Sequence, residues 1–279
     1  MKILVTGSEG LVGKSVCSAL ANQGHSYVSF DIATSGDILD FRALKEAAES
    51  CDAIVHSAAL LGFPGQTPGQ IMEVNLQGTW NVLSSALAND IQRIVFLSSV
   101  DVLGVFKGER EPDFLPLDES HNCYPRTPYA ISKYLAEEMC EVFAPAHNLD
   151  IVSLRPPGVW EAPATYEWIA NERKKRAEFE WDPFWEYGAF IDVRDLAQAC
   201  LSGLDANISG YRSLFVSSDD ITTSGKTSFD LRNKLHPNIE WRGGQEFLEN
   251  PFRTLLSNVA AKELLNWEPV NLWSHFKES

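Results

Sequence analysis

Tyr129 and Lys133 have the residue types and the spacing that could do chemistry in this chain. They lie four residues apart in TPYAISKYLAEE (127–138), next to Pro128, and this spacing places two side chains on one face of a helix. Free tyrosine has a pKa of about 10, and a nearby ammonium favours the phenolate and lowers that pKa. A phenolate can take the proton of a substrate hydroxyl while a hydride leaves the same carbon. The alternative is an amphipathic helix with a Tyr at its start and a solvated Lys.

A glycine-rich turn follows the first apolar run of the chain. Gly7, Gly10 and Gly13 lie in TGSEGLVG (6–13), between KILVT and a helical pattern. In this context the first glycine allows a tight turn, the second a close approach to a pyrophosphate, and the third close packing of helix on strand. The free N–H groups at the start of the helix favour phosphate. The alternative is an ordinary connection between a strand and a helix.

An acidic residue, Asp31, ends the second apolar run, at the position where dinucleotide-binding chains hold a ribose. A carboxylate there accepts hydrogen bonds from both ribose hydroxyls and repels the 2′-phosphate of NADP. No Arg or Lys lies between residues 15 and 41 to offset that repulsion. The sequence therefore predicts NAD as the cofactor.

Short apolar runs alternate with helical patterns and must position these residues. The runs are continuous, as expected for buried parallel strands, and they lie at 2–6, 26–30, 53–57, 93–98 and 151–155. Helical patterns lie near 11–23, 40–50, 68–89 and 127–147. This rhythm predicts an α/β fold with a Rossmann-type, doubly wound parallel sheet.

The rhythm breaks after residue 156, which suggests a division of the chain. We expect residues 1–155, with 191–215 returning to them, to form the dinucleotide-binding core. Residues 156–190 and 216–279 are expected to form a small C-terminal lobe that binds substrate. Within 191–205 we expect a short strand and then a helix capped by Asp195.

Composition limits the classes of function. The 279 residues are 44% hydrophobic and carry a net charge of −15, which argues for a globular protein that does not bind nucleic acid. The five cysteines are scattered without a C-x-x-C, so we expect no metal site, and reduced thiols in the cytoplasm. The start MKILVTG enters a strand directly, and no apolar run approaches a membrane span, so no signal peptide and no membrane association are expected.

Together these motifs resemble those of the extended short-chain dehydrogenase/reductase family, most closely its NAD-dependent epimerase/dehydratase group. TGSEGLVG resembles TGxxGxxG, VNLQGTWNV (74–82) resembles N-x-x-G-T-x-N, and FIDVRDLAQA (190–199) resembles FIHVDDLARA. FLSSVDVLG (96–104) resembles S-S-x-x-V-Y-G, which implies that Ser99 is the catalytic serine and that Lys133 also bonds the nicotinamide ribose. The resemblance implies further cofactor contacts in several motifs: Leu11, Asp37, Ile38, Ser57, Ala58, Asn75 and Pro156.

The substrate pocket is less well marked. Residues 166–190 hold eight aromatic residues, which could form the wall of a sugar pocket or could simply pack the lobe onto the sheet. The predicted substrate contacts are Leu60, Asp101, Trp160, Tyr166 and Trp168. Leu103 and Trp160 stand where the family usually has Tyr, so they could reshape this pocket.

Three functions fit these residues. The first is an NAD-dependent dehydrogenase that acts on a secondary alcohol of a free sugar or sugar acid, with Tyr129 as base. The second is a sugar-nucleotide epimerase or dehydratase in which tightly bound NAD is recycled, and the third is a non-catalytic NAD-sensing protein. The resemblance also implies a homodimer through helices 68–89 and 127–147.

Overall fold

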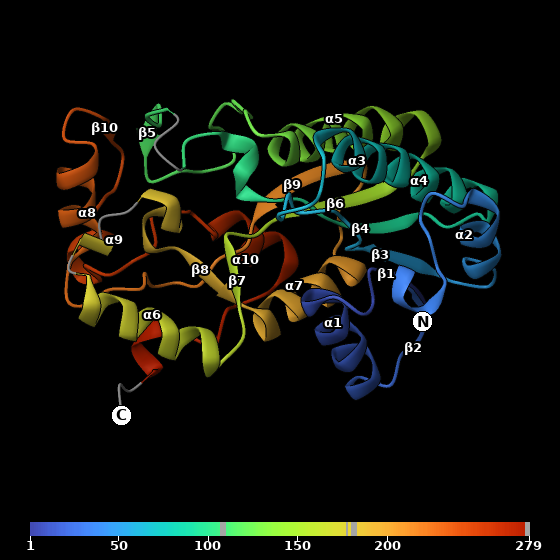
Figure 1. The fold of residues 1–279 in the computed structure, drawn as a ribbon, viewed down its shortest axis with the longest axis horizontal. Coiled ribbons are helices and arrows are strands. Elements are labelled where there is room, and N and C mark those ends of the chain that lie inside the picture. The colour runs from blue at the N-terminus through green and yellow to red at the C-terminus, as the bar shows by residue number, and fades with distance from the viewer. Residues whose placement is uncertain (107–109, 177, 180–182, 277–279) are drawn as a thin grey trace.

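A six-stranded parallel sheet forms the centre of the computed structural model, which describes residues 1–106, 110–176, 178–179 and 183–276, without the side chains of 183–185 (Figure 1). The strand order is β2-β1-β3-β4-β6-β9, with every neighbouring pair parallel. The bounds are β1 (Lys2–Thr6), β2 (Ser26–Phe30), β3 (Ala53–His56), β4 (Arg93–Leu97), β6 (Asp150–Arg155) and β9 (Tyr211–Phe215). The predicted doubly wound sheet is confirmed.

Helices cover both faces of the sheet (Figure 1). One face packs against α1 (Leu11–Asn22), α7 (Val193–Asp205) and α10 (Val259–Leu265). The other packs against α2 (Phe41–Ala47), α4 (Gly78–Ala88) and α5 (Pro128–His147). Successive residues of a strand therefore enter opposite cores: in β1, Ile3 and Val5 join the first and Leu4 the second. This explains why the strands read as continuous apolar runs.

The remaining elements lie beside the sheet or at one end of the molecule (Figure 1). A short α3 (Pro68–Met72) continues through a π-helical turn, Glu73–Gln77, into α4. Two small parallel sheets pair β5 (Phe114–Leu115) with β10 (Glu240–Trp241), and β7 (Gly158–Trp160) with β8 (Phe190–Asp192). The other helices are α6 (Ala164–Lys175), α8 (Ser228–Leu235) and α9 (Glu246–Glu249). Among the described residues, no helix is both long and apolar enough to cross a membrane.

The helix expected within 191–205 forms, but Asp192 rather than Asp195 caps it. Asp192 has an extended backbone, and its carboxylate accepts a hydrogen bond from the Arg194 N–H at 2.9 Å. Asp195 lies inside the first turn, where its buried carboxylate accepts hydrogen bonds from the N–H groups of Val270 and Asn271. The cap was assigned to the wrong acid because a tertiary contact occupies Asp195.

Two apolar clusters lie outside the sheet cores, and one of them cuts across the predicted division into core and lobe. One contains Val102, Leu103 and Phe106, which follow β4, together with residues from 187 to 256. Conversely, Leu265 and Trp267 pack into a sheet core. The division into two parts therefore stays a prediction.

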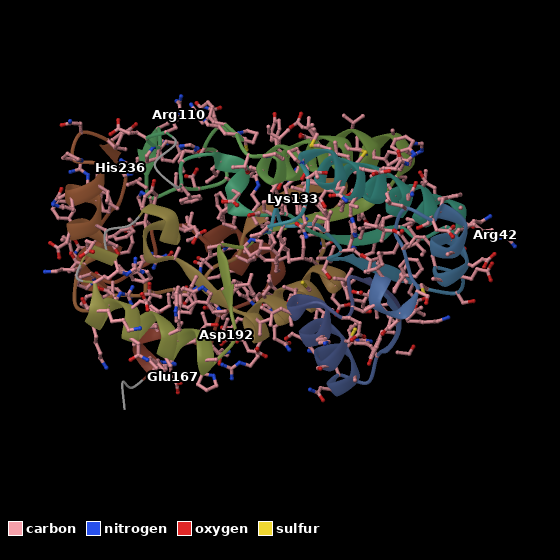
Figure 2. All side chains as sticks on the ribbon, viewed as in Figure 1. Arg42, Arg110, Lys133, Glu167, Asp192 and His236 are labelled. Carbon is pink, nitrogen blue, oxygen red and sulfur yellow. The ribbon has the colours of Figure 1, made fainter. Side chains whose placement is uncertain are left out.

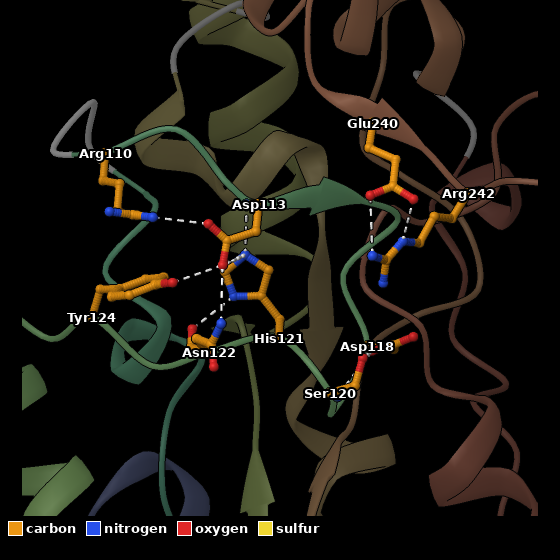
Figure 3. Close-up of polar contacts among 9 residues, drawn as sticks. All are labelled: Arg110, Asp113, Asp118, Ser120, His121, Asn122, Tyr124, Glu240 and Arg242. Atoms are coloured by element: carbon orange, nitrogen blue, oxygen red, sulfur yellow. Dashed lines mark hydrogen bonds and ion pairs between the residues drawn. The ribbon is translucent and has the colours of Figure 1, made fainter.

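The segment that leads into α5 is held by a polar network around Asp113 (Figure 3). The Asp113 carboxylate accepts hydrogen bonds from Arg110 Nη2 and from the Tyr124 hydroxyl, each at 2.8 Å. The Asp113 N–H donates to His121 Nε2 at 2.9 Å. The Arg110 guanidinium is the largest cause that lowers the pKa of Asp113, to about 2. This network fixes the chain shortly before the helix that carries Tyr129.

Candidate active site

The glycine turn between β1 and α1 has the shape that a phosphate loop needs. Gly7 has φ +71°, and a Cβ there would lie 2.6 Å from the Ala58 nitrogen. A Cβ on Gly13 would overlap the carbonyl oxygen of Gly7. Gly10 precedes the first residue of α1, so the free N–H groups of that helix open onto the turn. Larger residues at positions 7 and 13 would displace the loop.

Asp31 joins the end of β2 to this loop. Its carboxylate accepts hydrogen bonds from the N–H of Glu9 at 3.0 Å and from the N–H of Ala33 at 2.9 Å. Nearby, Asp37 accepts a hydrogen bond from the Leu39 N–H, and Ile38 is buried against Gly78, where a Cβ would lie 2.3 Å from the Ile38 Cδ1. Each carboxylate oxygen of Asp31 has a second lone pair that these backbone bonds leave available.

Two adjoining cavities run along the carboxyl ends of the strands and form what we call the trough. One has a volume of about 310 Å³ and lies at the Asp31 side; the other has about 560 Å³ and lies at the Tyr129 side. They share Gly7, Gly10, Ser57 and Ala59. The structure places nearly all predicted cofactor residues along the trough: Gly7, Gly10, Leu11, Gly13, Asp31, Asp37, Ile38, Ser57, Ala58, Tyr129, Lys133 and Pro156.

Asn75 is placed differently from the other predicted cofactor residues. Asn75 is buried, and it is not one of the described residues that line the trough. Its amide accepts from the Leu60 N–H at 2.8 Å and donates to the Leu60 carbonyl and to the Ser132 hydroxyl. Asn75 therefore holds the strand-end loop against α5. Leu60, predicted to touch substrate, lines the Asp31 side of the trough instead.

A third cavity, of about 460 Å³, lies beside the trough, and we call it the side cavity. Ser99, Tyr129 and Pro157 line both the side cavity and the trough. Asp101, predicted to touch substrate, also lines the side cavity. Sequence analysis missed several of its polar residues, which come from separate loops: Gln66, Thr127 and Glu186.

Local sequence explains how Tyr129 and Ser99 come together. Thr127 caps α5 by accepting the Ala130 N–H at 3.1 Å, and Pro128 occupies the first helical position, so Tyr129 projects from the first turn. Ser99 follows β4 and begins a short 3₁₀ helix, Val100–Leu103, by accepting the Asp101 N–H. The Ser99 hydroxyl lies close enough to the Tyr129 hydroxyl to influence its pKa.

The electrostatics of Tyr129 differ from the prediction. Burial raises the pKa of its hydroxyl, and the charge of Asp101 raises it further, whereas the hydrogen bond with Ser99 lowers it. The expected lowering by Lys133 is not found. Lys133 lies 5.9 Å from the centre of the Tyr129 ring, and its ammonium donates to the Leu97 carbonyl at 2.5 Å. Figure 2 shows Lys133 in the middle of the molecule, where burial lowers its own pKa to about 8.

Part of the predicted aromatic wall is buried in the protein interior. Trp160 and Tyr166 are 6% and 3% exposed and pack with Phe190 and Trp273 in one cluster. These rings join α6 to the β7–β8 sheet and to Trp273, and neither is among the described residues that line the side cavity, so their contact with substrate stays a prediction. Trp168 is exposed and contacts Phe179, and it too is absent from the described residues that line the side cavity. Trp181 and the side chains of Phe184 and Trp185, from the same aromatic stretch, lie outside the described residues.

Comparisons with known proteins agree with this architecture. Residues 3–212 match the model of the NAD dependent epimerase/dehydratase family. The UDP-glucose 4-epimerase of Rhizobium meliloti is 29% identical over 96% of this chain and 92% of that protein. An L-arabinose 1-dehydrogenase (NAD(P)(+)) of Haloferax volcanii is 33% identical, over 55% of this chain and 65% of that protein.

Solved structures show the same fold. A short-chain dehydrogenase/reductase superfamily protein from Agrobacterium tumefaciens, with bound NAD, has a TM-score of 0.71 and 22% identity, covering 98% of this chain and 94% of that chain. The UDP-glucose 4-epimerase of Thermotoga maritima, with UDP-glucose, has a TM-score of 0.70 and 22% identity, covering 96% and 94%.

Proposed function

The chain belongs to the NAD-dependent epimerase/dehydratase family, and from this premise we propose that it transfers a hydride between NAD and a secondary alcohol carbon of a small polyhydroxylated substrate. The observation that carries the proposal is that Ser99 and Tyr129 line both the trough and the side cavity. A substrate hydroxyl at this junction can hydrogen-bond to both side chains while the carbon that bears it faces the trough.

The residues of the trough fit NAD. The glycine loop leaves no room for a Cβ at Gly7 or Gly13 and opens onto helix N–H groups, which suits a pyrophosphate. The Asp31 carboxylate lines the far end, which suits ribose hydroxyls and disfavours a 2′-phosphate. Ser98, which lines the trough, is buried, and its Oγ has no hydrogen-bond partner among the described residues, so it can bond a bound group. We assign NAD contacts to all the trough residues predicted from the sequence, and an indirect role through Leu60 to Asn75.

Tyr129 acts as the base that takes the proton of the substrate hydroxyl. NAD, when bound, would supply a nicotinamide ring that can accept a hydride and whose positive charge would favour the phenolate of a neighbouring tyrosine. Tyr129 then accepts the proton of the substrate hydroxyl, and Ser99 orients that hydroxyl by hydrogen bonding. Lys133, held on the Leu97 carbonyl, places a cation at the floor of the trough. Because burial raises the pKa of Tyr129 in the chain alone and Lys133 does not lower it, the phenolate depends on the positive charge of the nicotinamide ring.

Two substrate classes remain in competition. The first is a free sugar or sugar acid that is oxidised with release of NADH. The second is a sugar nucleotide that is epimerised or dehydrated while NAD is recycled. The nearly full coverage of a UDP-glucose 4-epimerase favours this second class, and the match with an L-arabinose dehydrogenase, over 55% of the chain, favours the first. No observation favours a non-catalytic NAD sensor, because Ser99, Tyr129 and Lys133 all lie at the trough.

Two measurements on the purified protein separate these classes. A dehydrogenase produces NADH absorbance when NAD is added with neutral sugars or uronic acids. An epimerase carries bound NAD after purification and interconverts UDP-glucose and UDP-galactose without net NADH. A protein that binds no NAD, with neither activity across these panels, would contradict the proposal.

We further propose a homodimer through α4 and α5. Trp80 on α4 packs edge-on against Phe143 on α5, with ring centres 5.5 Å apart, so the outer surfaces of the two helices are continuous. Leu135 and Val142, seven residues apart on α5, are 40% and 72% exposed. A second copy would cover these apolar side chains. Sedimentation equilibrium should show a dimer that Val142→Lys dissociates, and a monomeric wild-type chain would contradict this assignment.

We also propose that the protein works in the cytoplasm. All five cysteines are free thiols, and four of them are buried. Reduced thiols are typical of that compartment. A disulfide found in the protein isolated from its cell would contradict this localisation.

A further inference from the structure

Two acidic side chains line the side cavity, at whose junction with the trough we place the substrate hydroxyl. They are Asp101, from the 3₁₀ turn after β4, and Glu186, from the segment Pro183–Gly188 that precedes β8. Asp101 lies close enough to Tyr129 for its charge to raise the pKa of the tyrosine hydroxyl. Among the described residues that line this cavity there is no Arg, Lys or His. The described wall of the side cavity therefore carries negative charge and no basic group.

The Glu186 carboxylate lies beside Gly158, the first residue of β7. A Cβ built on Gly158 would lie 3.6 Å from Glu186 Oε2, and both residues line the side cavity. Gly158 follows Pro157, which lines both the side cavity and the trough. The carboxylate thus lies near the junction of the two cavities, where its oxygen atoms can accept hydrogen bonds from a bound molecule.

The backbone that presents Glu186 is fixed by its neighbour, Tyr187. Glu186 and Tyr187 have φ values of +47° and +57°, which lie in the left-handed region and are unfavourable for residues other than glycine. Such a conformation persists only where the surrounding structure holds it. Tyr187 is buried, and its hydroxyl donates to the Val105 carbonyl at 3.0 Å and lies 3.1 Å from His236 Nε2. These contacts hold the segment, so that Glu186 faces the cavity from a fixed position.

Gln66 and Thr127 add hydrogen-bond donors to the same cavity. The Gln66 Oε1 accepts from the N–H groups of Gly62 and Phe63 at 2.8 Å and 3.0 Å, which fixes the orientation of the amide. Its Nε2 has no hydrogen-bond partner among the described residues and can donate to a substrate oxygen. The Thr127 hydroxyl accepts the Ala130 N–H, so its own proton is available to donate. The cavity therefore offers both donors and acceptors, which suits hydroxyl groups because a hydroxyl can donate and accept.

We propose that Glu186 is a specificity-determining residue that accepts hydrogen bonds from the hydroxyls of an uncharged sugar and disfavours sugar acids and sugar phosphates. This inference deepens the proposed function and rests on it, because it takes the substrate to lie in the side cavity. A carboxylate or phosphate on the sugar cannot donate to Glu186 and would meet its like charge. If the substrate is a sugar nucleotide, its phosphates must lie outside the side cavity.

The test measures, by calorimetry with NADH present, the dissociation constants of three matched pairs of ligands. The pairs are glucose and glucuronic acid, galactose and galacturonic acid, and UDP-glucose and UDP-glucuronic acid. In at least one pair the uncharged sugar should bind to the wild-type chain more tightly than the acid, by about tenfold or more. Glu186→Gln keeps the shape and removes the charge, and it should narrow this ratio by about tenfold, mainly because the acid binds more tightly.

The matched control is Glu167→Gln, which removes the same charge from an exposed position on α6 (Figure 2). Glu167 is not among the described residues that line the side cavity, so the ratio should stay within about twofold of the wild type. If Glu186→Gln does not fold, Glu186→Asn takes its place, because Asn adopts the left-handed backbone more readily.

Three results would overturn the proposal: an acid that binds at least as tightly as its uncharged counterpart in every pair, a ratio that the Glu186 variant leaves unchanged, or no binding in any pair. Binding is measured separately from hydride transfer, so the two proposals can fail independently. Binding with the expected preference, but without NADH formation or epimerisation, would refute the proposed function and leave this inference standing. Turnover by a wild-type chain that prefers the sugar acids would do the reverse.

Discussion

His56 provides a quantitative test of how the sheet core is built. The ring is 1% exposed, with Nδ1 lying 2.7 Å from the Thr6 hydroxyl and Nε2 lying 3.1 Å from the Thr79 hydroxyl. The Thr79 hydroxyl donates its proton to the Asn75 carbonyl, so it must accept from Nε2–H. Nδ1 is then the acceptor for Thr6. The structure thus holds a neutral ring, and protonation at Nδ1 would break that arrangement.

The magnitude follows from the pKa. Burial, and secondarily the charge of Lys133, lower the pKa of His56 from 6.5 to about 3. Below pH 6.5 the His56 side chain therefore binds a proton in the unfolded chain but not in the folded chain. The contribution of His56 to the free energy of unfolding is fully present above that pH and is lost as the pH decreases toward about 3. At about 1.4 kcal/mol per pKa unit, the free energy of unfolding should fall by about 2 kcal/mol between about pH 7.5 and about pH 5.

The assay is urea unfolding of the wild type and of His56→Gln at both pH values. The variant is expected to be less stable than the wild type at both pH values. Its free energy of unfolding should decrease less between the two pH values than that of the wild type, by about 2 kcal/mol. Contributions from His121 and His236, whose pKa values burial also lowers, are common to both proteins and cancel. Equal losses in the two proteins would refute this account of His56. An NMR titration that showed wild-type His56 protonating near pH 6.5 would refute it as well.

The other predictions concern the trough. Gly13→Ala would push a methyl group into the Gly7 carbonyl and should weaken NAD affinity, measured by calorimetry, by at least about tenfold. The control is Gly24→Ala, at a glycine with φ +76° and no neighbouring atoms, which should cause local strain but leave NAD affinity unchanged. Equal NAD affinities in the two variants would contradict the loop assignment. Asp31→Ser should narrow the preference for NAD over NADP by about tenfold or more, because it removes the charge that repels a 2′-phosphate, and an unaltered ratio of the two dissociation constants would show that Asp31 does not face the ribose. Asn75→Ala should lower the melting temperature and leave NAD affinity nearly unchanged, since the Asn75 amide holds Leu60 and Ser132. Weakened NAD affinity with an unchanged melting temperature would indicate direct contact with the cofactor.

Local patterns predicted most of the sheet and the glycine turn well, because the features that define them lie close together in the sequence. Apolar runs predicted five strands of the main sheet within one residue, namely β1, β2, β3, β4 and β6, but not the sixth strand, β9. The glycine spacing predicted the turn after β1. The positions of Tyr129 and Ser99 at the trough follow from the capped start of α5 and from the end of β4.

Features that depend on tertiary packing could not be read in this way. Aromatic composition does not distinguish a pocket wall from a buried cluster, and Trp160 and Tyr166 lie in such a cluster. The pKa of Tyr129 depends on burial and on Asp101, and helical spacing reports neither. Gln66 and Glu186 come from loops far apart in the sequence and meet only in the folded side cavity. The buried ion pair between Glu137 and Arg155 joins α5 to β6 and has no local signature.

The most direct test of the central claim is a crystal structure of this chain grown with NAD. We predict the pyrophosphate on the loop at residues 7–13, the adenine ribose hydroxyls on the carboxylate of Asp31, and the nicotinamide ring beside the hydroxyl of Tyr129. Density for NAD elsewhere on the molecule, or a nicotinamide ring on the side of the trough away from Tyr129 and Ser99, would contradict it.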